Sequence, residues 1–201
     1  MRYEENHHPA GWSGVGRVPD HAVGPPGQPP VAIDPNNPLF APGYMATAGS
    51  SDQFEIQSGQ LAQQMSQNPA VRNFGSMLIA DHTRSTQMIV GAAQSARIMP
   101  PPPAIMPQHQ ALLDELRAAG SGPNFDMTFK QIQIQAHTDG LALHQGYATS
   151  GDVPALRAAA SQIVPVVQMH LSQAQMLNVT PPAALPPPPA PPPPRRAGER
   201  G

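Results

Sequence analysis

The chain has 201 residues, no cysteine and a formal net charge of −2 at pH 7. Without cysteine it has no disulfide, no thiolate metal ligand and no thiol nucleophile, and so small a charge lacks the positive field that attracts nucleic acid. No apolar run approaches the roughly 20 residues that cross a bilayer. We therefore expect neither a nucleic-acid partner nor a transmembrane segment.

Proline divides the chain into three regions, with nine of its 28 prolines in residues 1–45 and ten in 179–201. Proline removes backbone donors, and these segments have few apolar side chains to offset the entropy of ordering. We expect disordered tails at 1–43 and 179–201 around one folded domain at 44–178. The run LPPPPAPPPPRR predicts a polyproline II rod, which serves as a spacer or as a contact point for an unknown protein partner.

The folded region is rich in Ala, Gln, Leu and Met, which favours helix, and it has no strand-like alternation of useful length. A first helix is predicted at about 44–66. Its apolar face repeats at helical spacing through Phe54, Ser58, Leu61 and Met65. The following QNPAV predicts a turn in which Asn68 caps a second helix and Pro69 is its first residue. The second helix is expected to end near residue 97.

The run IMPPPPAIMP ends that helix, and a short amphipathic helix is predicted at 108–119. A third long helix is expected to begin near Asn124, a second cap candidate, and to end at Gly151. A fourth is expected from about 154 to 178. Four long amphipathic helices, with short turns inside each half and a longer link between the halves, predict an all-α four-helix bundle with a short extra helix in a crossover link.

Three histidines interrupt the apolar faces of three different helices, and these are His82, His137 and His170. At a rise of about 1.5 Å per residue, Glu55 and His82 reach the same height in the first hairpin, and His137 and His170 differ by about 7 Å in the second. These four residues can meet in one layer of the bundle. Asp81 and His144 are further candidates for the same layer.

Imidazole and carboxylate are ligands for iron, zinc, manganese and copper(II), so the layer predicts a transition-metal site. The di-iron pattern needs Glu-x-x-His on two helices, which the sequence lacks, and a mononuclear His-rich site fits better. The alternative is a buried hydrogen-bond network that only fixes helix register. Glu55 has an alternative of its own, because Asp52 to Glu55 matches a capping box if the first helix starts late.

Other functional groups give weaker signals. Thioethers favour copper(I), but the ten methionines are better explained as fillers of irregular helical cores. Neither a Gly-x-Ser-x-Gly elbow nor a Gly-rich phosphate loop occurs. We therefore favour a non-enzymatic protein, with a small oxidase or peroxide-handling enzyme that uses the same metal as the weaker alternative.

Four stretches of the folded region carry a distinctive pattern: FEIQSGQLA, NPAVRNFGSMLIADHT, FDMTFKQIQIQAHTDGLAL and VPVVQMHLSQAQML. Their Glu-Ile, Asp-His-Thr, mid-helix His and His-Leu elements, in this order, resemble the DUF4142 family. That is a bacterial family of unknown function, often labelled "predicted outer membrane protein".

The resemblance covers about 50–178 and implies a ferritin-like four-helix bundle exported to the bacterial envelope. It carries five residues onto the family's characteristic polar positions, namely Glu55, Asp81, His82, His137 and His170. We therefore expect a periplasmic or envelope location. The N-terminal MRYEENHHPAGW has no apolar signal-peptide core, so a cytoplasmic location stays an alternative.

Overall fold

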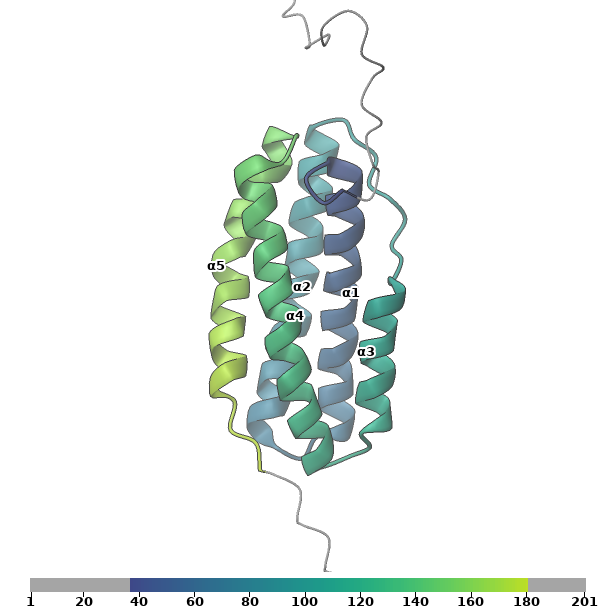
Figure 1. Cartoon of the computed structure of the whole chain (residues 1–201), viewed down its shortest axis with the longest axis vertical. Helices are drawn as coiled ribbons and strands as arrows, with labels where there is room; N and C mark the ends of the chain where they lie inside the picture. The colour runs from purple at the N-terminus through teal and green to yellow at the C-terminus, as the bar shows by residue number, and fades with distance from the viewer. Residues whose placement is uncertain (1–36, 181–201) are drawn as a thin grey trace, which may run out of the picture. The chain divides into compact units, whose positions relative to one another are not determined.

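The computed structural model of the chain describes residues 37–180, and every regular element in that range is a helix. The helices are α1 (Ala41–Met65), α2 (Pro69–Ser95), α3 (Pro107–Ala118), α4 (Pro123–Ser150) and α5 (Pro154–Met176) (Figure 1). The predicted all-α fold, with a short extra helix in the link, is confirmed. None of the described helices is long and apolar enough to cross a membrane. The predicted tail disorder and tail partner lie almost entirely outside the described residues.

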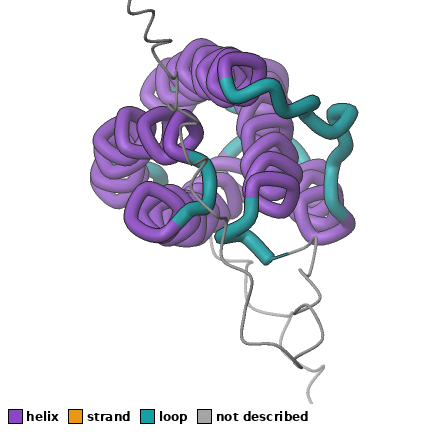
Figure 2. The backbone as a smooth tube through the Cα atoms, turned by 90° about the horizontal axis from the view of Figure 1, so that it is seen from above, coloured by secondary structure: helices purple, strands orange, loops and turns teal. Residues whose placement is uncertain are grey.

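The four long helices form two antiparallel hairpins, α1 with α2 and α4 with α5 (Figure 1). In addition α1 packs on α4, and α2 packs on α5. Hydrogen bonds between helix ends give the directions: Gly122 N donates to Met65 O at 3.1 Å, Asp152 N to Leu39 O at 3.2 Å, and Asn68 Nδ2 to Asn178 O at 2.8 Å. All neighbouring long helices therefore run antiparallel. Seen end-on, the helices surround a shared interior (Figure 2).

The chain passes from one hairpin to the other through a single long crossover, which is the ferritin-like arrangement. After α2 the link returns along the bundle, and α3 packs against α1 and α4 (Figure 1). Ser50 on α1 holds the link, because its Oγ accepts a hydrogen bond from Met106 N at 2.7 Å and lies 2.6 Å from His109 Nδ1.

Proline marks the start of every described helix, at its first or second position, as Pro42, Pro69, Pro107, Pro123 and Pro154. A backbone N–H in the first turn has no intrahelical acceptor, so proline loses no hydrogen bond there, and the fixed φ of proline suits a helix. Asn68 caps α2 as predicted, since its Oδ1 accepts from Ala70 N at 2.9 Å. The prediction that Asn124 caps α4 is wrong, because Pro123 is the first helical residue and Gly122, at φ +84°, precedes it.

The apolar core is divided into two clusters, one toward each end of the bundle. One is built around Phe74, Phe125 and Phe129, and the other around Tyr44, Tyr147 and several aliphatic residues. Buried polar residues lie near the boundary between the clusters on each long helix, namely Asp52, Glu55, Ser58, His82, Ser85, Gln133, His137 and His170. The bundle therefore has a polar layer near its middle, where the sequence predicted one.

Helices α1 and α2 approach each other closely at Gly59 and Gly75. A Cβ on Gly59 would lie 2.5 Å from Gly75 O, and a Cβ on Gly75 would lie 2.9 Å from Gly59 O. Both contacts are with backbone, so a side chain at either position would force the helices apart. This close packing holds the Asp52–Glu55 segment of α1 against the His82 segment of α2.

We expect Gly59→Ala to lower the free energy of unfolding by about 1–3 kcal/mol, the usual cost of overpacking a core. Gly49→Ala on the same helix is the matched control, because a Cβ there meets nothing within 4 Å. The control should stabilise the protein by about 0.5–1 kcal/mol through helix propensity. Urea denaturation of both variants measures the difference, and two equally stabilised variants would contradict the close approach.

Candidate metal centre

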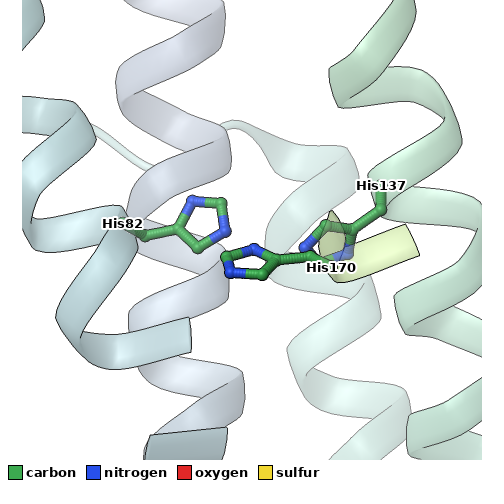
Figure 3. A group of neighbouring side chains, drawn as sticks. All are labelled: His82, His137 and His170. Carbon is green, nitrogen blue, oxygen red and sulfur yellow. The ribbon is translucent and has the colours of Figure 1, made fainter. Parts of the chain in front are cut away.

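Three buried histidines from three helices converge in the polar layer. His82 on α2, His137 on α4 and His170 on α5 are 6%, 2% and 0% exposed. One ring nitrogen from each lies within 4.8 Å of the other two, and the ring centroids are 5.2–5.7 Å apart. Figure 3 shows the rings turned toward one another. The three histidines therefore lie on the inward helix faces that the sequence predicted, and they meet there.

Each ring has one nitrogen that is held by an acceptor outside the triad. His82 Nδ1 donates to Asp52 Oδ1 at 2.8 Å, His137 Nδ1 to Gln133 O at 2.9 Å, and His170 Nε2 to Asp81 Oδ2 at 3.1 Å. A carboxylate or carbonyl oxygen only accepts, so each of these nitrogens must carry the proton. The other nitrogen of each neutral ring then holds a lone pair.

The remaining nitrogens are the ones that face inward. His82 Nε2, His137 Nε2 and His170 Nδ1 are all buried and have no hydrogen-bond partner among residues 37–180. Metal-binding histidines commonly donate their other nitrogen to a carboxylate or a backbone carbonyl, which fixes the tautomer and the ring orientation. The triad has that arrangement. Bonds of about 2.0–2.1 Å in a tetrahedral site place ligand nitrogens roughly 3.4 Å apart, so the rings would close slightly around an ion.

The electrostatics of the layer keep two of the rings neutral. Burial, together with positive charge on His82, lowers the pKa of His137 to about 3. Burial also lowers the pKa of His170 to about 4, together with charge on His82 and His137. Burial alone would lower the pKa of His82, but the hydrogen bond and charge of Asp52 outweigh it and raise the pKa overall. At neutral pH two lone pairs are therefore available without loss of a proton.

Glu55 lies beside the triad and not within it. It is 1% exposed, its Oε1 lies 3.7 Å from the outward-facing His137 Nδ1, and its Oε2 lies 3.4 Å from Ser58 Oγ. Burial raises the pKa of Glu55. The capping-box alternative is wrong, because α1 begins at Ala41 and places Asp52 and Glu55 in its interior.

His144 occupies a different part of the core, two helical turns beyond His137. Its Nδ1 lies 3.0 Å from Tyr44 Oη. Burial raises the pKa of Tyr44, so the phenol keeps its proton and donates it to Nδ1. Burial also lowers the pKa of His144 to about 4. The structure thus brings together the three triad histidines, places Glu55 and Asp81 at their margin, and leaves His144 with Tyr44.

Asp52 is a site residue that the sequence analysis missed as such. It is 2% exposed, and besides His82 it accepts a hydrogen bond from Thr86 Oγ1 at 2.9 Å. A signal for it existed, because Asp52 is one turn before Glu55 on the same helix face. The hairpin register that pairs Glu55 with His82 also brings Asp52 to the level of Thr86.

Comparison with known proteins gives a family and two structures of similar fold. The family model described as "Domain of unknown function (DUF4142)" matches residues 27–177. Similar solved structures are described as "CopM in the Cu(II)-bound form" and "CopM in the Ag-bound form (by co-crystallization)". Each is 18% identical to this chain, covers 68% of it and 94% or 93% of the CopM chain, with TM-scores of 0.57 and 0.56. No curated protein matches the sequence. At this identity the likeness to CopM is one of fold.

We expect His144 to make the metal-free protein sensitive to acid. Its pKa rises from about 4 in the folded state to 6.5 in the unfolded chain, so the unfolded chain binds the proton first. Neutral His144 makes its full contribution to the free energy of unfolding above pH 6.5. That contribution, roughly 3 kcal/mol at most, is lost as the pH falls toward 4. His144→Gln should therefore lose less unfolding free energy than the parent between pH 7 and 4, measured by urea denaturation in chelator. Parallel pH profiles would contradict the assignment.

Proposed function

The chain belongs to the DUF4142 family, and from that premise we propose that its bundle binds one transition-metal ion through His82, His137 and His170. The observation that supports this function is the set of three inward ring nitrogens, all buried and all without a partner. Their outward nitrogens are already committed to Asp52, Gln133 and Asp81, so the lone pairs can only face one another.

A metal accounts for this geometry better than a hydrogen-bond network does. Leaving a buried polar atom unpaired costs about 1–3 kcal/mol, and native proteins leave few such atoms. Lone pairs cannot hydrogen-bond one another without a proton, and burial opposes protonation of His137 and His170. A proton on His82, whose pKa is raised, would still leave at least one of the other two lone pairs without a donor. A cation satisfies all three acceptors at once.

The surrounding acids supply the charge that a buried cation requires. Asp52 and Asp81 each contact one of the ligand rings, and Glu55 lies 3.7 Å from a third. A buried cation is expensive unless opposite charges lie nearby, and a bound cation favours the ionised form of a neighbouring carboxyl group. The layer is therefore suited to a divalent ion, which would favour the ionised form of Glu55.

Copper(II) is the ion we favour among iron, zinc, manganese and copper. Nitrogen ligands bind divalent first-row metals most strongly at copper in the Irving–Williams order. A protein of similar fold, CopM, has been described in a Cu(II)-bound form. With neither a nucleophile nor a substrate-binding loop in evidence, storage or buffering of the metal fits better than catalysis. An envelope location stays a prediction from the family.

A structural role is the second candidate, supported by the way the triad connects helices. The His82–Asp52 bond joins α2 to α1, and the His170–Asp81 bond joins α5 to α2. These contacts stabilise the bundle register with or without a metal. The two candidates differ in whether a cation binds, so metal content separates them.

We expect the untagged full-length protein to bind one tight equivalent of Cu(II) that His137→Ala abolishes. His144→Gln is the matched control, since it removes another buried histidine of α4 that bonds to Tyr44. Three further histidines at positions 7, 8 and 21 are a source of weaker binding, so the readout is the difference between variants. Elemental analysis after dialysis and titration calorimetry measure it. Equal copper content in parent and His137→Ala would leave only the structural role.

Asp52→Asn should weaken Cu(II) binding about 10–100-fold without changing the stoichiometry, as is usual when the hydrogen-bond partner of a ligand histidine is altered. The substitution keeps the shape but removes the charge that orients and polarises His82. Asp139→Asn is the control, because Asp139 is an exposed carboxylate two residues from His137 that bonds only to Gln135. Competition with a chelator of known affinity gives both Kd values, and equal values would contradict the role of Asp52.

A further inference from the structure

Ser85 is a buried polar residue that the proposed triad does not use. It lies on α2 one turn after His82 and is 6% exposed. Its Oγ is buried without a hydrogen-bond partner in the part of the chain that the structure describes. A hydroxyl in that position ordinarily finds an acceptor, because leaving it unpaired is costly.

Ser85 does not use the usual hydrogen-bond acceptor of a helical serine, a backbone carbonyl of its own helix. Serine and threonine hydroxyls inside helices often donate to a carbonyl three or four residues earlier. Seven others in this bundle do so, namely Ser58, Thr83, Ser95, Thr138, Thr149, Ser161 and Ser172. Ser85 Oγ makes no such bond, so its orientation is not explained by its own helix.

Ser85 faces a small cavity that adjoins the triad. The cavity lies between α2 and α5 and has a volume of about 40 Å³. Its lining includes His82, Ser85 and His170, the charged or polar side chains of Asp81, Arg84 and Gln162, and apolar residues such as Met88 and Val167. A single water molecule needs roughly 10–15 Å³ measured in this way. The space therefore fits a ligand of one to three atoms, next to two of the three imidazoles.

We propose that a metal held by the triad keeps an open coordination position on this side, and that Ser85 Oγ–H donates a hydrogen bond to a small anion bound there. This inference rests on the proposed metal site. Three protein nitrogens leave at least one position of a four-coordinate ion free, and an open position is the pattern of sites that exchange ligands. A hydroxyl aimed at that position would select an anion that accepts a hydrogen bond, such as hydroxide or azide.

The other candidate for the fourth ligand lies elsewhere. The Oε1 atom of Glu55 is near His137 Nδ1, the nitrogen that faces away from the triad. Its Oε2 is held by Ser58, whose Oγ in turn accepts from Gln133 Nε2 at 2.9 Å. Glu55 is not among the residues that line the cavity beside Ser85, so the position on that side stays open to an outside ligand.

Azide titration of the full-length protein loaded with one equivalent of Cu(II) tests this inference. Azide bound to copper gives a charge-transfer absorption, and His137→Ala treated in the same way gives the background from other copper sites. We expect saturable azide binding in the parent protein and roughly tenfold weaker binding in Ser85→Ala, the effect of losing one hydrogen bond to an anion. Ser85→Thr should restore the affinity. Thr83→Ala is the control, because that hydroxyl bonds to Ile79 O on the exposed side of the same helix.

The outcomes separate the two proposals. Copper affinity should be equal within about threefold in parent, Ser85→Ala and Thr83→Ala, since Ser85 is not a ligand of the metal. If the parent binds copper through the triad but azide does not bind, or binds Ser85→Ala equally well, the open position with Ser85 is overturned and the metal site stands. If His137→Ala holds copper as tightly as the parent, the metal site is overturned and the inference falls with it.

Discussion

Each of the three imidazoles buried at mid-height in this apolar bundle needs an acceptor for its outward N–H. His137 finds one in its own helix, whereas the other two use a neighbouring helix and so fix the register of α1, α2 and α5. His82 finds Asp52 across the α1–α2 interface, and His170 finds Asp81 across the α2–α5 interface. A slide of one helical turn, about 5.4 Å, would break either contact, and in the first case it would leave Asp52 buried without its partner. The polar layer thus restricts the bundle to one alignment, as buried polar groups do in some other helical assemblies.

The long helices supply different groups to that layer. Helix α1 has no histidine in the triad, yet it supplies both Asp52 and Glu55. Helices α2, α4 and α5 supply one ring each. Two of the three acids therefore come from a helix without a triad histidine, whereas Asp81 lies beside His82 on α2. The electrostatic environment of the triad thus depends on the contact between α1 and α2. The close approach at Gly59 and Gly75 is what holds that contact tight.

Much of the fold could be predicted from the sequence, because helical periodicity and proline punctuation are local signals. Counting residues from the first turn also brought Glu55 to the height of His82, since rise per residue is constant. The site was predicted less completely. His144 shares a helix face with His137, but two turns separate them. A shared face does not place two residues at the same level along the bundle. Asp52 and Ser85 depend on rotamers and on which atom meets which partner, and no periodic pattern contains that information. The capping-box alternative for Glu55 required a late helix start, and α1 begins at Ala41 instead.

The crossover is also the covalent connection between the two hairpins that carry the triad. The first hairpin contributes His82, whereas the second contributes His137 and His170, and in sequence the two are joined only by the link that contains α3. Between α2 and α3 that link has no regular structure, and its Met99 is 90% exposed, so it is a natural place for a protease to cut. After such a cut the two hairpins would be separate polypeptides. An ion bound by all three rings would then join the two fragments, and removing the ion would allow them to dissociate.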